Sequence, residues 1–185
     1  MDGAFQRIRQ SVPAGRACRN QEGYETMNAI SDITLPKGLL WFGNNLLSIP
    51  VSCDAGADGL SVIEQWAPHG DSPPMHVHAT QDEIFIVLEG RLRIVLGGSE
   101  LELAAGHTAM APKGIAHTYR VESAEGAHFL AITRGPEFET MIRNMSRPAE
   151  QARLPKPSAP TPEMIAALTA ACAESGIEIV GPPLA

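Results

Sequence analysis

The chain has 185 residues, of which 44% are hydrophobic, and a formal net charge of −7 at pH 7. This length suits one domain with short appendages and is enough to bury a core. The acidic balance lacks the basic footprint of a nucleic-acid-binding protein, so we expect no nucleic-acid partner. No apolar run approaches the ~20 residues that cross a bilayer, so we expect no membrane partner either.

Residues 1–26 differ in composition from the rest of the chain. They contain four arginines and few core-forming residues. We expect a disordered extension without a chemical role, or a protein that starts at Met27. An organelle transit peptide is the alternative, since such peptides are rich in arginine, but Asp2, Glu22 and Glu25 argue against it.

From Leu39 onward, short apolar runs recur at intervals of about ten residues, separated by turn clusters. The 17 glycines and 15 prolines of the chain suit many short strands joined by turns. This pattern predicts a sandwich or barrel in which alternate side chains face the interior. The predicted strands are 39–42, 46–51, 60–66, 75–78, 84–88, 92–96, 107–111, 117–121 and 127–133.

Two helices are predicted after the strands. Pro136 can begin the first, because apolar residues from Phe138 to Met145 repeat at helical spacing. Residues 148–162 have the composition of a proline-rich linker. Thr161 resembles an N-cap for a helix over 163–175 that ends at Gly176. We therefore divide the chain into an extension (1–26), a barrel with its following helix (27–147), and a proline-rich linker with a helical tail (148–185).

The three cysteines, Cys18, Cys53 and Cys172, are scattered and have no CxxC spacing. A disulfide framework or a thiolate zinc site is therefore not indicated. The N-terminus also lacks the hydrophobic region of a secretory signal. We expect a reducing, cytoplasmic location.

Four residues within about forty positions predict a metal site. His76 and His78 are two residues apart on a predicted strand and therefore share a face. Glu83 opens the next strand after a polar break, and His117 follows the turn at 112–114. Three imidazoles and one carboxylate are ligands that suit a first-row divalent metal. Each of these four residues, taken alone, can also be explained as an ordinary strand or surface residue. The other histidines lie outside the spacing, and we interpret His69 and His107 as turn or strand-edge residues and His128 as a surface residue of a strand.

The spacing of these residues resembles the two motifs of the cupin family. The first block is Gly70-x5-His76-x-His78-x4-Glu83-x6-Gly90, and the second is Gly106-x5-Pro112-x-Gly114-x2-His117. The second block departs at Val121, where an asparagine that is not a ligand is often found. The resemblance implies an all-β fold, a double-stranded β-helix (jelly-roll barrel) followed by C-terminal helices. More loosely, the chain is similar to small single-domain bacterial cupins related to quercetin 2,3-dioxygenases.

Four protein ligands leave two positions open in an octahedral site, for water, a bidentate substrate, or substrate beside dioxygen. We expect one divalent transition metal, with Fe(II) as the first choice and Mn, Co, Ni, Cu or Zn as compatible ions. The leading hypothesis is a dioxygenase, an oxidoreductase whose small aromatic, phenolic or enolisable substrate binds the metal through oxygen. A non-oxidative metal cupin (isomerase, lyase or decarboxylase) and a non-catalytic small-molecule-binding cupin are the alternatives.

The resemblance to quercetinase-like cupins also implies that Glu83 is both a metal ligand and the base that takes the substrate proton. Strand alternation places Phe85 and Val87 on the face of Glu83 and Tyr119 on the face of His117. These three, with Met110, are our candidates for the substrate pocket, although ordinary core packing explains them equally well. The family resemblance further suggests a homodimer.

Overall fold

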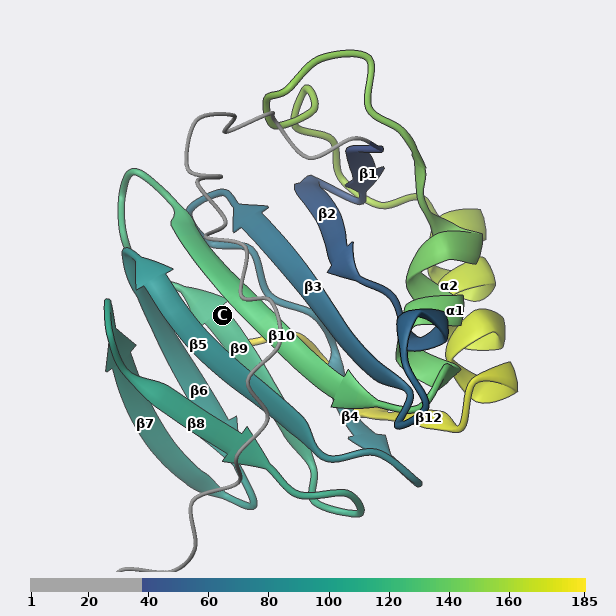
Figure 1. The fold of residues 1–185 in the computed structure, drawn as a ribbon. Coiled ribbons are helices and arrows are strands. Elements are labelled where there is room, and N and C mark those ends of the chain that lie inside the picture. The colour runs from purple at the N-terminus through teal and green to yellow at the C-terminus, as the bar shows by residue number, and fades with distance from the viewer. Residues whose placement is uncertain (1–37) are drawn as a thin grey trace, which may run out of the picture. The chain divides into compact units, whose positions relative to one another are not determined.

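The computed structural model describes residues 38–185, so the predicted extension over 1–26 lies outside the described residues. The described chain forms two antiparallel sheets (Figure 1). In the seven-stranded sheet the strand order is β11-β1-β2-β3-β10-β5-β8, and in the five-stranded sheet it is β12-β4-β9-β6-β7. The strands are β1 (Leu40–Phe42), β2 (Asn45–Val51), β3 (Leu60–Ala67), β4 (Met75–His78), β5 (Glu83–Glu89), β6 (Arg91–Leu96), β7 (Ser99–Ala104), β8 (Thr108–Ala111), β9 (His117–Val121), β10 (Ala127–Arg134), β11 (Arg147–Pro148) and β12 (Ile177–Gly181). The predicted all-β jelly-roll class is confirmed, and β7, β11 and β12 are additions to the predicted strands.

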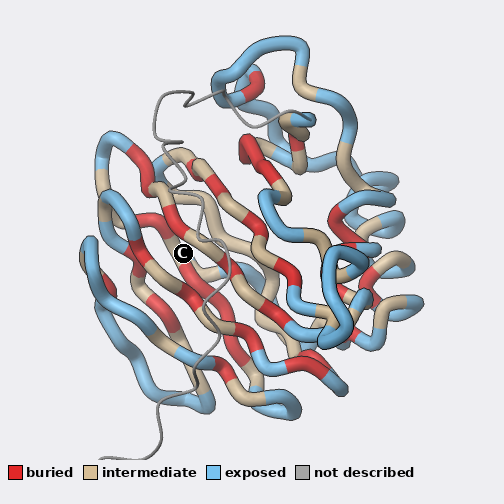
Figure 2. The backbone as a smooth tube through the Cα atoms, in the orientation of Figure 1, coloured by how far each residue is buried: buried red, intermediate tan, exposed pale blue. Residues whose placement is uncertain are grey.

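Burial alternates along the strands, because successive side chains of a strand point to opposite faces (Figure 2). In β3 the alternate residues Ile63, Gln65 and Ala67 are buried, and in β5 Glu83, Phe85 and Val87 are. The interleaved residues form an outer face of intermediate exposure. The sequence alternation therefore defines an inner and an outer face of the seven-stranded sheet.

The glycines of the predicted motifs are turn residues. Gly90, between β5 and β6, has φ of 81°, a conformation that side-chain-bearing residues rarely adopt. A Cβ at this position would lie 2.5 Å from the carbonyl oxygen of Gly126. The turn between β5 and β6 can therefore approach the backbone of Gly126 this closely only because position 90 is glycine.

The interior consists of two adjoining hydrophobic clusters. The barrel cluster lies between the two sheets and includes Phe85, Val87, Leu92, Tyr119 and Phe129. The helix cluster packs the inner face of β2, β3 and β10 against the helices and β12. Its buried members are Leu47, Ile63, Ala131, Phe138, Met141, Ile142, Cys172 and Ile177.

The two helices form as predicted, and they lie beside β2 (Figure 1). They are α1 (Glu137–Met145) and α2 (Pro162–Glu174), and a short 3-10 turn spans Cys53–Ala55. The Thr161 side chain accepts a hydrogen bond from the N–H of Met164, so Thr161 is the N-cap of α2. Gly176 follows the helix with φ of 65°, as a C-terminal glycine does. None of the helices in residues 38–185 has the length and apolar character that a membrane span requires.

The C-terminal segment is more than the helical tail that the sequence predicted. Residues 177–181 form β12, the edge strand of the five-stranded sheet, paired with β4. In this register Ile177 lies opposite His78 and Ile179 opposite His76. The prediction was wrong here because the short apolar alternation after Gly176 carries no turn or motif that reveals its partner strand. The strand β4, which bears His76 and His78, is therefore hydrogen-bonded to a strand about 100 residues further along the chain.

The proline-rich segment is also packed, since several contacts hold it to the β1–β2 hairpin. The indole N–H of Trp41 donates to the carbonyl oxygen of Arg153 at 2.8 Å. Asn44 and Ser158 exchange two hydrogen bonds, of 3.1 and 3.0 Å. We call residues 149–158 the strap.

We predict that β12 contributes to stability through Ile177, which is 3% exposed. Ile177→Ala should lower the free energy of unfolding by about 2–4 kcal/mol, because it leaves a cavity in the helix cluster. Val180→Ala, at an exposed position of the same strand, should change it by less than about 0.5 kcal/mol. Denaturant titration of both variants measures the difference, and equal effects would mean that β12 is not packed as described.

A buried carboxylate fixes α1 to the β2–β3 connection. Glu139 is 2% exposed, and its oxygens accept hydrogen bonds from the Ser52 hydroxyl (2.8 Å), the Cys53 N–H (2.8 Å), the Ser61 hydroxyl (2.9 Å) and the Arg143 guanidinium (2.8 Å). Burial opposes ionisation, but these donors outweigh it and lower the pKa of Glu139 to about 2.

The stability that Glu139 contributes should therefore depend on pH. Because its pKa is lower in the folded chain than the ordinary value, the contribution is complete above about pH 4.3 and disappears as the pH falls towards 2. Glu139→Gln should lower the free energy of unfolding at pH 7 by about 2–3 kcal/mol and flatten this acid dependence. Thermal unfolding between pH 2 and 7 measures the pH dependence of stability for Glu139→Gln and for Glu150→Gln, a control at an exposed position. The same pH dependence of stability in both variants would contradict the prediction.

Candidate metal centre

The four predicted ligand residues converge between the two sheets. His76 and His78 come from β4 and His117 from β9, both in the five-stranded sheet, and His76 lies directly opposite His117. Glu83 is the first residue of β5 in the seven-stranded sheet, where it lies opposite Thr133 and Ala111. One sheet therefore supplies the three imidazoles and the other supplies the carboxylate.

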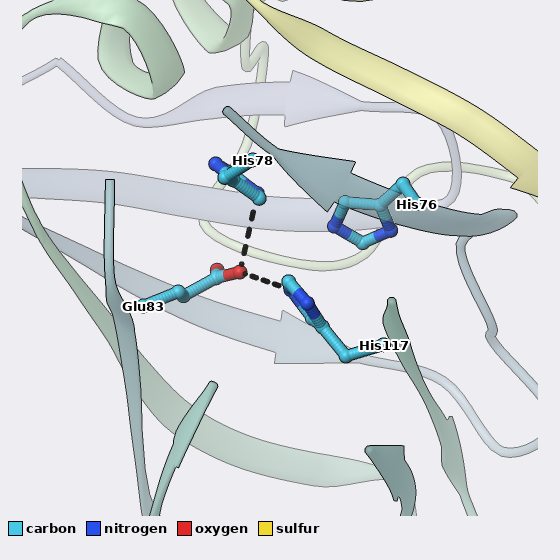
Figure 3. A group of neighbouring side chains, drawn as sticks. All are labelled: His76, His78, Glu83 and His117. Atoms are coloured by element: carbon cyan, nitrogen blue, oxygen red, sulfur yellow. Dashed lines mark hydrogen bonds and ion pairs between the residues drawn. The ribbon is translucent and has the colours of Figure 1, made fainter. Parts of the chain in front are cut away.

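The side chains point towards a common centre (Figure 3). One ligand atom from each of the four residues lies within 4.8 Å of the others. The Oε2 atom of Glu83 is 3.0 Å from Nε2 of His117 and 3.4 Å from Nε2 of His78. His78, Glu83 and His117 are at most 2% exposed, whereas His76 is half-buried and marks the more open side.

Backbone contacts orient two of the rings. Nδ1 of His76 lies 2.7 Å from the carbonyl oxygen of Pro74, and Nδ1 of His117 lies 2.9 Å from that of Ile115. A carbonyl only accepts, so each Nδ1 carries the proton and donates it. The lone pair of each neutral ring is then on Nε2, and for His117 this atom faces Glu83. Such outer contacts are typical of metal-binding histidines.

His78 supplies the test of whether a metal fits. Within residues 38–185, neither of its buried ring nitrogens has a hydrogen-bond partner. An unpaired buried polar group is unfavourable, and here Nε2 lies 3.4 Å from the Glu83 carboxylate. A cation at the centre would take the lone pair of Nε2 and balance the charge of the carboxylate, so the residues fit a divalent metal of the kind that takes imidazole and carboxylate ligands.

The pKa values follow from the burial and proximity of these groups. Burial lowers the pKa of His76 to about 4, partly opposed by the charge of Glu83, so this ring is neutral at pH 7. Burial also lowers the pKa of His78. Burial alone would raise the pKa of Glu83 and lower that of His117, but their hydrogen bond reverses both directions. The hydrogen bond between Glu83 and His117 therefore favours a carboxylate beside a protonated ring.

Several contacts that the sequence did not reveal hold the site together. The N–H of Gly114 donates to the carbonyl oxygen of His78 at 2.8 Å, so the turn of the second motif is tied to the strand of the first. The ring of Phe138 in α1 stands edge-on to His78, with centroids 5.5 Å apart. Gln81 is 2% exposed; it donates to the carbonyl oxygen of Arg134 and accepts from the N–H of Phe138, both at 3.0 Å. In the sequence, only the position of Gln81 between His78 and Glu83 pointed to a role for Gln81 at the site.

Three of the four predicted pocket residues face the interior. Phe85, Val87 and Tyr119 are buried in the barrel cluster, and Phe85 lies edge-on to both His117 and Tyr119. Met110 is a correction to the prediction. It is 52% exposed and pairs with Ile84, whose side chain is on the outer face, so it points away from Glu83. Strand alternation explains the difference, because Ala111 is the β8 residue opposite Glu83.

Tyr119 belongs to a second polar group that the sequence did not predict. Its hydroxyl donates to Oδ2 of Asp71 at 3.5 Å, and Nδ2 of Asn45 donates to the same oxygen at 3.0 Å. Burial raises the pKa of Asp71, and burial with the charge of Asp71 raises that of Tyr119 well above its ordinary value. Tyr119 is therefore a neutral phenol at pH 7.

Comparison with known proteins identifies the barrel. Residues 62–133, which run from β3 to β10 and include all four clustered residues, match the family model described as "Cupin domain". The chain therefore contains a cupin domain. Among curated proteins, the chain is 30% identical over 82 residues to quercetin 2,3-dioxygenase of Bacillus subtilis (strain 168). The match covers 44% of this chain but only 24% of that relative, so the chain spans about a quarter of its length.

Solved structures also match about half of the chain. KdgF from Halomonas sp. is 19% identical and matches with a TM-score of 0.45, over 49% of this chain and 78% of that one. A sugar phosphate isomerase of the cupin superfamily from Silicibacter pomeroyi is 22% identical and matches with a TM-score of 0.46, over 53% and 71% of the two chains.

We predict that the histidines of the cluster hold a metal. His76→Ala and His117→Ala should each weaken metal binding by at least about tenfold, since even outer-shell partners of metal ligands contribute that much. The barrel should still fold, because the residues lie in a wall that other contacts form. Elemental analysis after dialysis measures retention, with His69→Ala as the control because His69 is exposed and outside the cluster. Full retention of metal in both His76→Ala and His117→Ala would show that these histidines do not hold a metal.

Proposed function

We propose that this cupin is a metal-dependent dioxygenase acting on a small aromatic, phenolic or enolisable substrate. The convergence of His76, His78, Glu83 and His117 on one buried point carries the proposal. The partial match to a quercetin dioxygenase supports the reaction class. When bound, a divalent metal such as Fe(II) would supply Lewis acidity towards a substrate oxygen and a route for electrons.

Glu83 is the group best placed to take a proton from the substrate. Its carboxylate is fully buried, and Oε2 lies 3.0 Å from Nε2 of His117. A proton that arrives on this carboxylate stays there, because Nδ1 of His117 already carries a proton that it donates to the carbonyl oxygen of Ile115, and its Nε2 would hold the metal. Deprotonation of a hydroxyl or an acidic carbon makes the substrate richer in electrons, which reaction with dioxygen requires.

The surrounding residues would orient the substrate and exclude water. Phe85 and Phe129 stand edge-on to Tyr119, which gives the interior an aromatic wall next to His117. Such a wall favours a planar apolar ring. His76 is the most exposed of the four clustered residues, so the substrate would approach from its side.

The reaction class is tested by oxygen uptake. Protein reconstituted with Fe(II), and separately with Mn(II), Co(II), Ni(II) or Cu(II), is given a flavonol, a catechol or a β-diketone in an oxygen-electrode cell. We expect at least one pair of metal and substrate to consume one dioxygen per substrate. Conversion of substrate at an equal rate without oxygen would replace the proposal with a non-oxidative lyase or isomerase.

Glu83→Gln tests the role of the carboxylate in the same assay. The variant should keep more metal than His76→Ala and lose at least about 100-fold in turnover, the usual contribution of a general base. Glu102→Gln, at an exposed position of β7, should keep the wild-type turnover. Wild-type turnover in Glu83→Gln at full metal occupancy would remove the proton-accepting role.

A further inference from the structure

A cavity lies away from the four-residue cluster of the candidate metal centre. It has a volume of about 670 Å³, which is in the range of small-molecule sites. Trp66 and His128 line it from the outer face of the seven-stranded sheet, and the strap contributes Arg153 and Leu154. In β10, His128 is five positions before Thr133, the residue opposite Glu83, so the two sites are separated by about 17 Å along the strand.

A chain of hydrogen bonds orients His128 towards a ligand. The hydroxyl of Ser48, which is 1% exposed, donates to Oε2 of Glu64 at 2.8 Å. The other oxygen of Glu64 lies 2.9 Å from Nε2 of His128, which donates to it. In the tautomer that this bond selects, the lone pair of the ring is on Nδ1. Within residues 38–185, this nitrogen has no hydrogen-bond partner, so it can accept one from a ligand.

The walls of the cavity favour a flat apolar ring. His128 and Trp66 are opposite each other in adjacent strands and stack with centroids 4.5 Å apart and planes 13° apart. Stacking and the bond to Glu64 together hold both rings in place without the help of a ligand. Leu46 and Leu154 add apolar surface. Such preformed surfaces bind aromatic groups with little loss of side-chain freedom.

The charges of the cavity favour a cation. Glu89 and Glu125 are exposed carboxylates in the lining, whereas Arg153 is the single basic residue there. A ligand with a protonated amine would meet an excess of negative charge and the electron-rich faces of the stacked rings. Its N–H groups also match the free acceptor of His128.

We propose that this cavity is a binding site for a small aromatic amine, with the ring against Trp66 and His128 and the ammonium group towards Glu89 and Glu125. The site is separate from the metal centre, and the proposal does not depend on the oxygenase reaction.

Calorimetric titration with 2-phenylethylamine tests the proposal on the full chain. We expect one site per chain with a Kd of about 1 mM or tighter, and binding of 3-phenylpropionate at least about tenfold weaker, because it has a similar ring with the opposite charge. Amines also coordinate metals, so the titration is repeated after treatment with a chelator, and the affinity should not change. No binding of the amine, equal binding of the anion, or loss of binding on chelation would each overturn the proposal.

Variants assign the binding to the cavity. His128→Phe keeps a ring for stacking but removes the acceptor, and it should weaken binding by about fivefold or more, which is the effect of one lost hydrogen bond. Glu125→Gln changes an exposed side chain with little risk to folding and should weaken binding to a similar extent. Glu102→Gln removes a carboxylate of the other sheet and should bind like the wild type. Wild-type affinity in both His128→Phe and Glu125→Gln would overturn the proposal.

Discussion

The rest of this structure depends on one constraint, which is that the two sheets bring one buried carboxylate next to three imidazoles. Glu83 is fixed by β5, and the histidines by β4 and β9. With His76 and His117 donating their Nδ1 protons to the backbone, the atoms that face the centre are acceptors. Buried acceptors that face one another are unfavourable unless a positive charge is shared among them. The close approach of the sheets at this point therefore requires either a proton or a metal ion.

Elements late in the chain complete this centre. β12 pairs with β4 along the strand that carries His76 and His78. Phe138 in α1 contacts His78, and Gln81 holds the start of that helix beside the loop leading to Glu83. The four-residue cluster is consequently at the junction of the barrel cluster and the helix cluster, with Phe85 on one side and Phe138 on the other. A site between two packed clusters has little freedom to rearrange.

The two faces of the seven-stranded sheet use the same residue types differently. The inner face places Glu83 against His117 and His78, with all three side chains at most 2% exposed. The outer face places Glu64 against His128, at 19% and 18% exposure. Because the outer pair is partly exposed to solvent, the Glu64 carboxylate needs no buried cation and mainly orients the ring. The three inner side chains are buried away from solvent, so the Glu83 carboxylate needs a compensating cation.

Sequence alone determined the strand alternation, both helices with the Thr161 cap and Gly176 end, and the four residues that converge between the sheets. These are local features, because each depends on spacing within a strand, a turn or a helix. Only the tertiary structure decided that 177–181 is a strand, since its partner β4 is about 100 residues earlier. It also decided the place of Met110, because the face of a strand depends on its register with β5. The pairing of Ser48, Glu64 and His128 likewise brings together three strands that no local pattern connects.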